Sequence, residues 1–126
     1  MSSAVSKRAR QASPRSVTGD PLAARPLLDE THAFELTALY KVLANPHRLR
    51  LLHALTRAGE LPVGALADEV GMSIQAVSNQ LRQLADQRIV AARRNGNQAL
   101  YRVIDPCVGG LLELGMCLVE QDRRPS

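Results

Sequence analysis

Residues 62–84 of the chain read PVGALADEVGMSIQAVSNQLRQL, and this stretch decides the fold. Apolar residues recur at helical spacing up to Gly71, a residue type that readily ends a helix. Ser73 then has the side chain of a helix N-cap. We expect one helix from Pro62 and a second one capped by Ser73. Their inner faces are Val63, Leu66, Ala67 and Val70 in the first, and Ile74, Val77, Leu81 and Leu84 in the second. The pattern predicts a helix-turn-helix.

The outer face of the second helix is polar. Amide side chains on such a face can pair with adenine in a major groove, and guanidinium groups with guanine. A hydroxyl group at the helix N-terminus can also meet a phosphate. We therefore predict DNA-contacting residues on this helix: Ser73, Gln75, Ser78, Asn79, Gln80 and Arg82. One alternative is a merely solvated helix face. Another is a winged helix used only for protein contacts, whose outer face would be apolar.

A β-hairpin is predicted after the helix pair. Residues 89–94 and 98–104 are expected to form its strands. Asn95-Gly96 is a strong turn signal between them, because both turn positions favour positive φ. The tip of the hairpin is basic, and we expect Arg93, Arg94 and Asn97 to contact a minor groove or the DNA backbone. The alternative is an ordinary charged hairpin.

Two helices are expected before the motif and one after the hairpin. The first begins near Thr31, and its apolar residues are Phe34, Leu36, Leu39, Tyr40, Val42 and Leu43. Asn45-Pro46 caps and starts the second, which runs to about Arg57. We expect this helix to bury Leu49, Leu52 and Leu55 and to point Arg48 and Arg50 elsewhere. Asp105-Pro106 starts the last helix. The order α-α-α-α-β-β-α is a winged helix-turn-helix, mainly α with a small β-hairpin wing, in the α+β class.

The last helix is apolar around most of its circumference, which is unusual for a helix at the rim of a small monomer. It needs a second surface to cover it. We expect a homodimer formed through the first and last helices, as the two half-sites of a DNA operator require. The alternative is that one chain buries the helix by itself.

The charge of the chain is unevenly placed. Residues 1–27 are expected to be a disordered basic tail, which holds five basic residues and one acid and so accounts for the whole net charge of +4. We expect residues 28–121 to form the DNA-binding and dimerisation domain and residues 122–126 to form a short tail. No apolar run is long enough to cross a membrane or resembles a signal peptide, so the sequence predicts a cytoplasmic protein without a membrane partner. It offers no nucleophile–base arrangement and no glycine-rich phosphate loop, which argues against an enzyme.

Three stretches resemble the ArsR/SmtB family of bacterial winged-helix repressors: LANPHRLRLL at residues 43–52, SIQAVSNQLRQL at 73–84 and RRNGNQALY at 93–101. The resemblance covers about residues 31–121. It implies a homodimer that represses transcription from a double-stranded DNA operator and releases it when an inducer binds. Inducers in the family include metal ions, arsenite and, in some branches, reactive sulfur or oxidants. The resemblance implies no cofactor for DNA binding itself.

The chain departs from the family at its metal sites. Pro62 occupies the position where many members carry a metal-ligating cysteine. Other members bind metal on the last helix. At the matching positions Asp105 remains, Cys107 replaces a histidine, and Cys117 lies near the far ligands. An inducer site made of imidazoles is therefore disfavoured.

The two cysteines suggest the chemistry of an inducer site. Ten residues of helix rise about 15 Å, so Cys107 and Cys117 of one chain cannot share a metal ion or form a disulfide. Antiparallel pairing of two last helices could bring Cys107 of one subunit near Cys117 of the other. Two thiolates suit a soft metal or metalloid ion, with a further ligand from Asp105, Glu113, Glu120 or His32. They equally suit a redox change by an oxidant or reactive sulfur. The remaining alternative is that both cysteines are structural.

Overall fold

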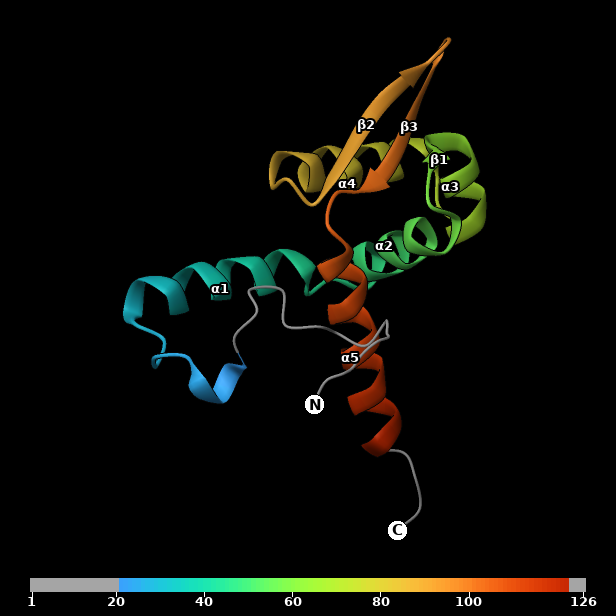
Figure 1. Ribbon diagram of the computed structural model, residues 1–126. Coiled ribbons are helices and arrows are strands. Elements are labelled where there is room, and N and C mark those ends of the chain that lie inside the picture. Colours follow the sequence, from blue (N-terminus) through green and yellow to red (C-terminus); the bar gives the residue numbers. More distant parts are fainter. Residues whose placement is uncertain (1–20, 123–126) are drawn as a thin grey trace. The chain divides into compact units, whose positions relative to one another are not determined.

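A computed structural model describes residues 21–122 of the chain (Figure 1). Its elements are the 3-10 turn η2 (Leu22–Ala24), the helices α1 (Glu30–Leu43), α2 (Pro46–Ala58), α3 (Val63–Val70), α4 (Ile74–Asp86) and α5 (Pro106–Asp122), and the strands β1 (Leu61–Pro62), β2 (Val90–Asn95) and β3 (Gln98–Val103). The chain divides into two compact units, Met1–Ala38 and Leu39–Ser126. The second unit is the predicted winged helix-turn-helix of the α+β class.

The expected caps start the central helices. Asn45 Oδ1 accepts hydrogen bonds from the backbone N–H groups of His47 at 2.9 Å and Arg48 at 3.2 Å, at the start of α2. Ser73 Oγ accepts one from the N–H of Ala76 at 3.1 Å, at the start of α4. Between α3 and α4, Gly71 adopts the left-handed conformation with φ 70°. These local interactions set the helix-turn-helix geometry.

The core of the second unit lies between α2, α3, α4 and the sheet. Its fully buried side chains are Leu51, Leu52, Leu55, Leu66, Val77, Leu81, Leu84 and Val90. Two predictions were wrong. Leu49 is 37% exposed, because the inner face of α2 is centred on Leu51, Leu52 and Leu55. Ile74 is 57% exposed, because the first residue of α4 lies past the edge of the core.

The sheet has one more strand than the sequence predicts. The strand order is β1-β3-β2 and both pairings are antiparallel. The extra strand, β1, places Leu61 opposite Tyr101 and Pro62 opposite Leu100. Pro62 therefore ends a strand and stands at the N-cap of α3, and the helix begins one residue later than expected. A two-residue strand has no periodicity by which a sequence could reveal it.

The hairpin turn is also shifted by one residue. Asn95 pairs with Gln98 in the ladder, so Gly96 and Asn97 are the two central residues of the turn. Gly96 has φ 67°, whereas Asn97 is not among the described residues with positive φ. Glycine at the first central position is the pattern of a type II′ turn, which suits a twisted hairpin as well as the expected type I′ turn does.

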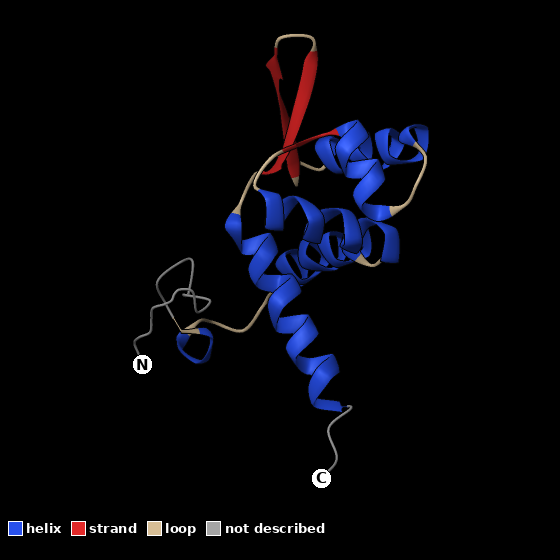
Figure 2. Cartoon of the chain, turned by 90° about the vertical axis from the view of Figure 1, so that its right-hand side faces the viewer, coloured by secondary structure: helices blue, strands red, loops and turns tan. Residues whose placement is uncertain are grey.

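Helix α5 is covered on one side only. Val108 is buried, and Leu111 and Leu112 pack against the core of the second unit. Farther along the helix, four apolar side chains are 47–66% exposed: Leu114, Met116, Leu118 and Val119. The second half of α5 and the β2–β3 hairpin project from opposite sides of the helices α2–α4 (Figure 2).

The predicted tails fall largely outside the described residues, which exclude 1–20 and 123–126. Within the predicted N-terminal tail, residues 22–24 form the exposed turn η2. At the other end, α5 continues through Asp122, one residue into the predicted C-terminal tail. None of the described helices is long and apolar enough to cross a membrane.

Candidate nucleic-acid interface and the thiol-bearing helix

The outer face of α4 presents the expected polar side chains. Gln75, Asn79 and Arg82 are exposed and Ser78 is half-buried. Arg82 Nη1 donates to Asn79 Oδ1 at 3.2 Å, one turn earlier on the helix. Ser73 uses its oxygen as the cap, so its hydroxyl hydrogen stays available to an acceptor such as a phosphate. The group can make base-edge contacts without changing the fold.

Gln80 does not belong with these exposed residues. Its Oε1 accepts a hydrogen bond from Arg48 Nε of α2 at 2.7 Å, and Gln83 Oε1 accepts another from Arg48 Nη2. Gln80 is half-buried, on the flank of α4 that faces α2. Arg48 lies away from the buried leucine face of α2, as expected, but it contacts α4, which the sequence analysis did not predict. Sequence periodicity could not show this contact, because it joins residues 32 positions apart.

The two arginines of the wing lie on opposite faces of the hairpin. Consecutive strand residues alternate between faces, and residues paired across a ladder share a face. Arg94 pairs with Ala99, and Arg93 pairs with Leu100. One surface of DNA therefore cannot meet both side chains in the same way. Asn97 is exposed at the turn.

Arg93 is bound by a residue that the sequence reasoning missed. Its Nε and Nη2 donate to the two carboxylate oxygens of Glu60, at 2.7 and 2.9 Å. These hydrogen bonds lower the pKa of Glu60 and raise that of Arg93, and the nearby charge of Arg102 lowers the pKa of Glu60 further. The pair joins the wing to the residue that precedes β1. Arg94 is thus left as the wing cation on the opposite face.

The end of α4 carries another cation, whose backbone has an unusual conformation. Arg88 has φ 62°, the only positive φ among the described non-glycine residues. Arg88 N–H bonds to Ala85 O at 2.9 Å and Ile89 N–H to Leu84 O at 2.9 Å, which is the Schellman pattern at a helix C-terminus. Glycine is the usual residue at this position. The guanidinium group is exposed beside the negative end of the helix dipole.

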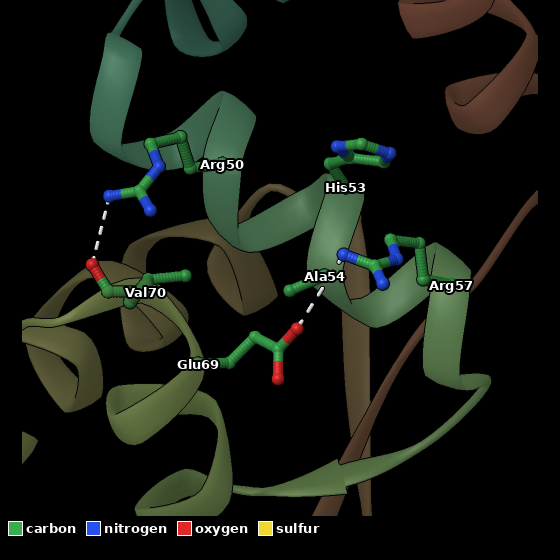
Figure 3. A pocket seen from close by; sticks show the side chains of 6 residues that line it. All are labelled: Arg50, His53, Ala54, Arg57, Glu69 and Val70. Carbon is green, nitrogen blue, oxygen red and sulfur yellow. Dashed lines mark hydrogen bonds and ion pairs between the residues drawn. The ribbon is translucent and has the colours of Figure 1, made fainter.

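A small pocket lies between α2 and α3 (Figure 3). Its lining residues are Arg50, His53, Ala54, Arg57, Glu69 and Val70. Arg50 Nη1 donates to the carbonyl oxygen of Val70 at 2.8 Å, and Arg57 Nη1 lies 3.6 Å from Glu69 Oε2. Val70 is the last residue of α3, so Arg50 supports the chain just before the turn into α4. Arg50 thus ties α2 to the end of α3, whereas the ion pair of Arg57 with Glu69 is exposed to solvent.

The two cysteines both lie on α5, ten residues apart. Cys107 is half-buried, and its N–H donates to Asp105 Oδ1 at 2.8 Å; Cys117 and Glu120 are exposed. In the part of the chain that the structure describes, no three His, Cys, Asp or Glu side chains come together as a metal site. His32 instead contacts Asp29 Oδ1 through Nδ1 at 2.8 Å and through its N–H at 2.8 Å, and these contacts lower the pKa of Asp29. A thiol-based site needs residues from a second chain.

The two cysteines lie on a face of α5 whose residues are regularly spaced. Cys107, Gly110, Leu114, Cys117 and Gln121 follow one another at steps of three, four, three and four residues. That spacing is the seam of a helix that packs against another helix. Leu114 is 48% exposed, and a Cβ added at Gly110 would meet nothing within 4 Å. This face is here called the thiol seam, and its second half, from Leu114 onward, is exposed in the single chain.

Comparison with known proteins shows that the chain is similar to transcriptional regulators. A family profile described as a helix-turn-helix domain matches residues 43–93. The HTH-type transcriptional regulator NmtR of Mycobacterium tuberculosis is 37% identical over 105 residues, which cover 79% of this chain and 87% of NmtR. The crystal structure of the antimony-specific transcriptional repressor AntR has a TM-score of 0.74 and 55% identity, and covers 82% of this chain and 94% of that one.

A third similar structure is that of a homodimer. The homodimeric winged helix-turn-helix DNA-binding domain of a possible ArsR-family transcriptional regulator from Mycobacterium bovis has a TM-score of 0.64 and 30% identity. The match covers 78% of this chain and 93% of that domain.

Proposed function

Because this chain belongs to the ArsR/SmtB family of winged helix-turn-helix transcriptional repressors, we propose that it holds its operator as a homodimer and releases it when a soft metalloid or metal ion binds Cys107 and Cys117. The family consists of DNA-binding regulators and not of enzymes. Since such a repressor acts beside the chromosome, we expect this protein in the cytoplasm. The observation that carries the inducer proposal is the thiol seam of α5.

The DNA-binding half of the proposal rests on α4 and the wing. Gln75, Asn79 and Arg82 are the base-reading candidates, with Ser78 beside them and Ser73 at a phosphate. Arg94 and Asn97 are the backbone or minor-groove candidates of the wing. We propose a lesser role for Arg93, whose charge Glu60 already neutralises, and for Gln80, whose amide oxygen Arg48 engages.

The exposed apolar side of α5 supports the proposed homodimer. Burial of exposed apolar side chains is favourable, by about 25 cal/mol per Å² removed from water. We expect two copies of α5 to pack antiparallel along the thiol seam, with α1 adding to the interface. If the two-fold axis passes at the height of Leu112, residue 107 of one chain stands opposite residue 117 of the other. Gly110 then faces Leu114, a small residue against a large one.

The chemistry follows from that pairing. Two thiolates from different chains are soft ligands at one place, which suits trivalent antimony or arsenic and other soft ions. Asp105 or Glu120 would add an oxygen ligand. When a metalloid hydroxide binds, each thiol proton leaves with one hydroxide as water, so no net proton is released. A metal cation instead displaces the thiol protons into solution, so metal affinity rises with pH. The 55% identity to a repressor named for antimony favours a metalloid over an oxidant as the signal.

The test follows release of a fluorescent duplex from the reduced dimer as antimonite, arsenite, cadmium or polysulfide is added. The duplex carries the DNA upstream of the gene. Cys107→Ser and Cys117→Ser should each abolish release and leave binding in the absence of inducer intact. Met116→Leu, a change at another exposed sulfur of α5, is the control and should behave as the wild type. Release by polysulfide alone would favour the redox mechanism, and unchanged induction in both serine variants would make the cysteines structural.

A mixing experiment tests the pairing between chains. Neither serine variant alone contains a complete pair of thiols. A heterodimer of the two variants contains one complete pair if Cys107 of one chain meets Cys117 of the other, and none if the pairs lie elsewhere. In a 1:1 mixture about half of the dimers are heterodimers, so metalloid binding should return at about a quarter of the wild-type stoichiometry. Failure to regain any would contradict the proposed arrangement of α5.

A further inference from the structure

Arg48 is a half-buried cation whose three nitrogen atoms all have acceptors within the chain. Its Nε donates to Gln80 Oε1 at 2.7 Å, its Nη1 to the carbonyl oxygen of Val42 at 2.9 Å, and its Nη2 to Gln83 Oε1. None of these acceptors is a carboxylate. The three partners belong to α4 and to the last turn of α1, while Arg48 itself is in the first turn of α2. One guanidinium group thus joins three helices.

The two glutamines are placed to act together. Gln80 and Gln83 stand three residues apart, so their amides lie on the same flank of α4, one turn from each other. The planar fork of an arginine matches such a pair, whereas a lysine could serve only part of it. Val42 supplies a carbonyl from the C-terminal end of α1, where the helix dipole favours a positive charge. The geometry therefore needs an arginine and not merely a cation.

These hydrogen bonds differ in kind from the other attachments of α4. The inner face of α4 consists of Val77, Leu81 and Leu84, which are fully buried apolar side chains. Hydrophobic burial keeps this face toward the core but is not directional, so by itself it fixes the rotation of the helix about its own axis only coarsely. Hydrogen bonds weaken steeply away from their preferred angle. The bonds to Gln80 and Gln83 are thus suited to set that rotation.

We propose that Arg48 is a positioning residue for DNA recognition. It sets the rotation of α4 against the end of α1, and so aims Gln75, Asn79 and Arg82 at the base edges without touching DNA itself. This inference rests on the proposed function, since it assumes that α4 reads an operator. It adds a link between the recognition helix and α1, one of the two helices expected in the dimer. The spacing of the two recognition helices would then depend on Arg48.

The test compares Arg48→Met with Arg57→Met, the same change at an exposed position of the same helix. Arg48→Met should weaken operator binding about tenfold or more, the equivalent of one or two charge-assisted hydrogen bonds, and leave binding to random DNA unchanged. The slope of the logarithm of affinity against the logarithm of salt concentration should also stay unchanged. Arg48→Lys should recover part of the loss, and Arg57→Met should show none.

Two further measurements separate positioning from a direct contact. If Arg48 acts through the glutamines, the variant Gln80→Met with Gln83→Met should lose about as much operator affinity as Arg48→Met, and combining all three should add little. A direct phosphate contact would instead reduce the salt slope by about one and weaken binding to all sequences alike. That result, or additive losses, would overturn the proposal.

A readout without DNA keeps the inference separate from the proposed function. In Arg48→Met, amide hydrogen exchange of α4 should be faster than in Arg57→Met, while the core amides of α2 stay protected. Equal exchange in α4 would overturn the inference even if the protein binds its operator. If the wild type ignores duplex DNA yet α4 loses protection in Arg48→Met, the proposed function fails and the positioning of α4 stands.

Discussion

Helices α4 and α5 have apolar residues at the same helical spacing, but their exposed faces differ in polarity. Val77, Leu81 and Leu84 of α4 are fully buried, and its outer face is polar. On α5 only Val108 is buried, and Leu118 is 66% exposed. The apolar face of α4 is thus buried within one chain, and its exposed polar groups are the ones that we propose to contact DNA. Helix α5 leaves apolar surface exposed in the single chain, and the proposed homodimer would cover it with a second copy.

The largest expected effect on dimerisation and operator binding comes from a substitution in the thiol seam. Leu114→Glu would place two carboxylates in the proposed interface, and an unpaired buried charge is strongly unfavourable. We expect a monomer by analytical ultracentrifugation and a loss of operator affinity of roughly 10²-fold or more, because two linked half-sites bind far more tightly than one. Glu113→Gln, at an exposed neighbour outside the seam, should remain dimeric. A dimeric Leu114→Glu would show that α5 is covered in some other way.

On α4 the expected effect is smaller and specific to sequence. Arg82→Ala should cost about 1–3 kcal/mol of operator binding and relax the preference at one base position, while the protein stays dimeric. The free energy of unfolding should hardly change, because Arg82 is exposed and its hydrogen bond to Asn79 lies at the surface of the same helix. Competition binding with single-base operator variants measures the effect. Equal losses on operator and random DNA would instead assign Arg82 to the backbone.

The wing offers a matched pair of arginines. Arg94→Ala should weaken binding to all duplexes by a few-fold and reduce the salt slope by about one, as the loss of one phosphate contact does. Arg93→Ala should change the salt slope less, because Glu60 already neutralises that charge. The measurement is a salt titration of both variants side by side. A larger effect at Arg93 would mean that DNA displaces Glu60.

The smallest expected effect is a dependence of stability on pH. Arg93 lowers the pKa of Glu60 in the folded chain. The contribution of this pair is therefore present above the ordinary glutamate pKa, about 4.3, and is lost as the pH falls through the lower folded value. Thermal melts should show a small acid-side loss in the wild type that is absent from Glu60→Gln. A steeper acid loss in Glu60→Gln would reverse the sign and reject the pair as a stabilising contact.

Much of the local fold around α4 could be predicted because its signals are local. Ser73 and Asn45 are caps within three residues of the N–H groups that they accept from, and Gly71 ends a helix through its own φ. Such features need no knowledge of the rest of the fold. The errors arose at the edges of elements. Leu49 and Ile74 were wrongly assigned to the buried faces of their helices, and the hairpin turn was placed one residue too early.

By itself, the sequence determined the order of the five helices and the β2–β3 hairpin, the polar face of α4 and the placement of both thiols on α5, since each depends on spacing along one segment. The tertiary structure alone decided that Gln80 belongs to Arg48, that Arg93 belongs to Glu60, and that Arg94 lies on the other face of the wing. These pairings join residues 32 or 33 positions apart. Strand register and the contact between α2 and α4 set these pairings, and neither produces a periodic pattern in the sequence.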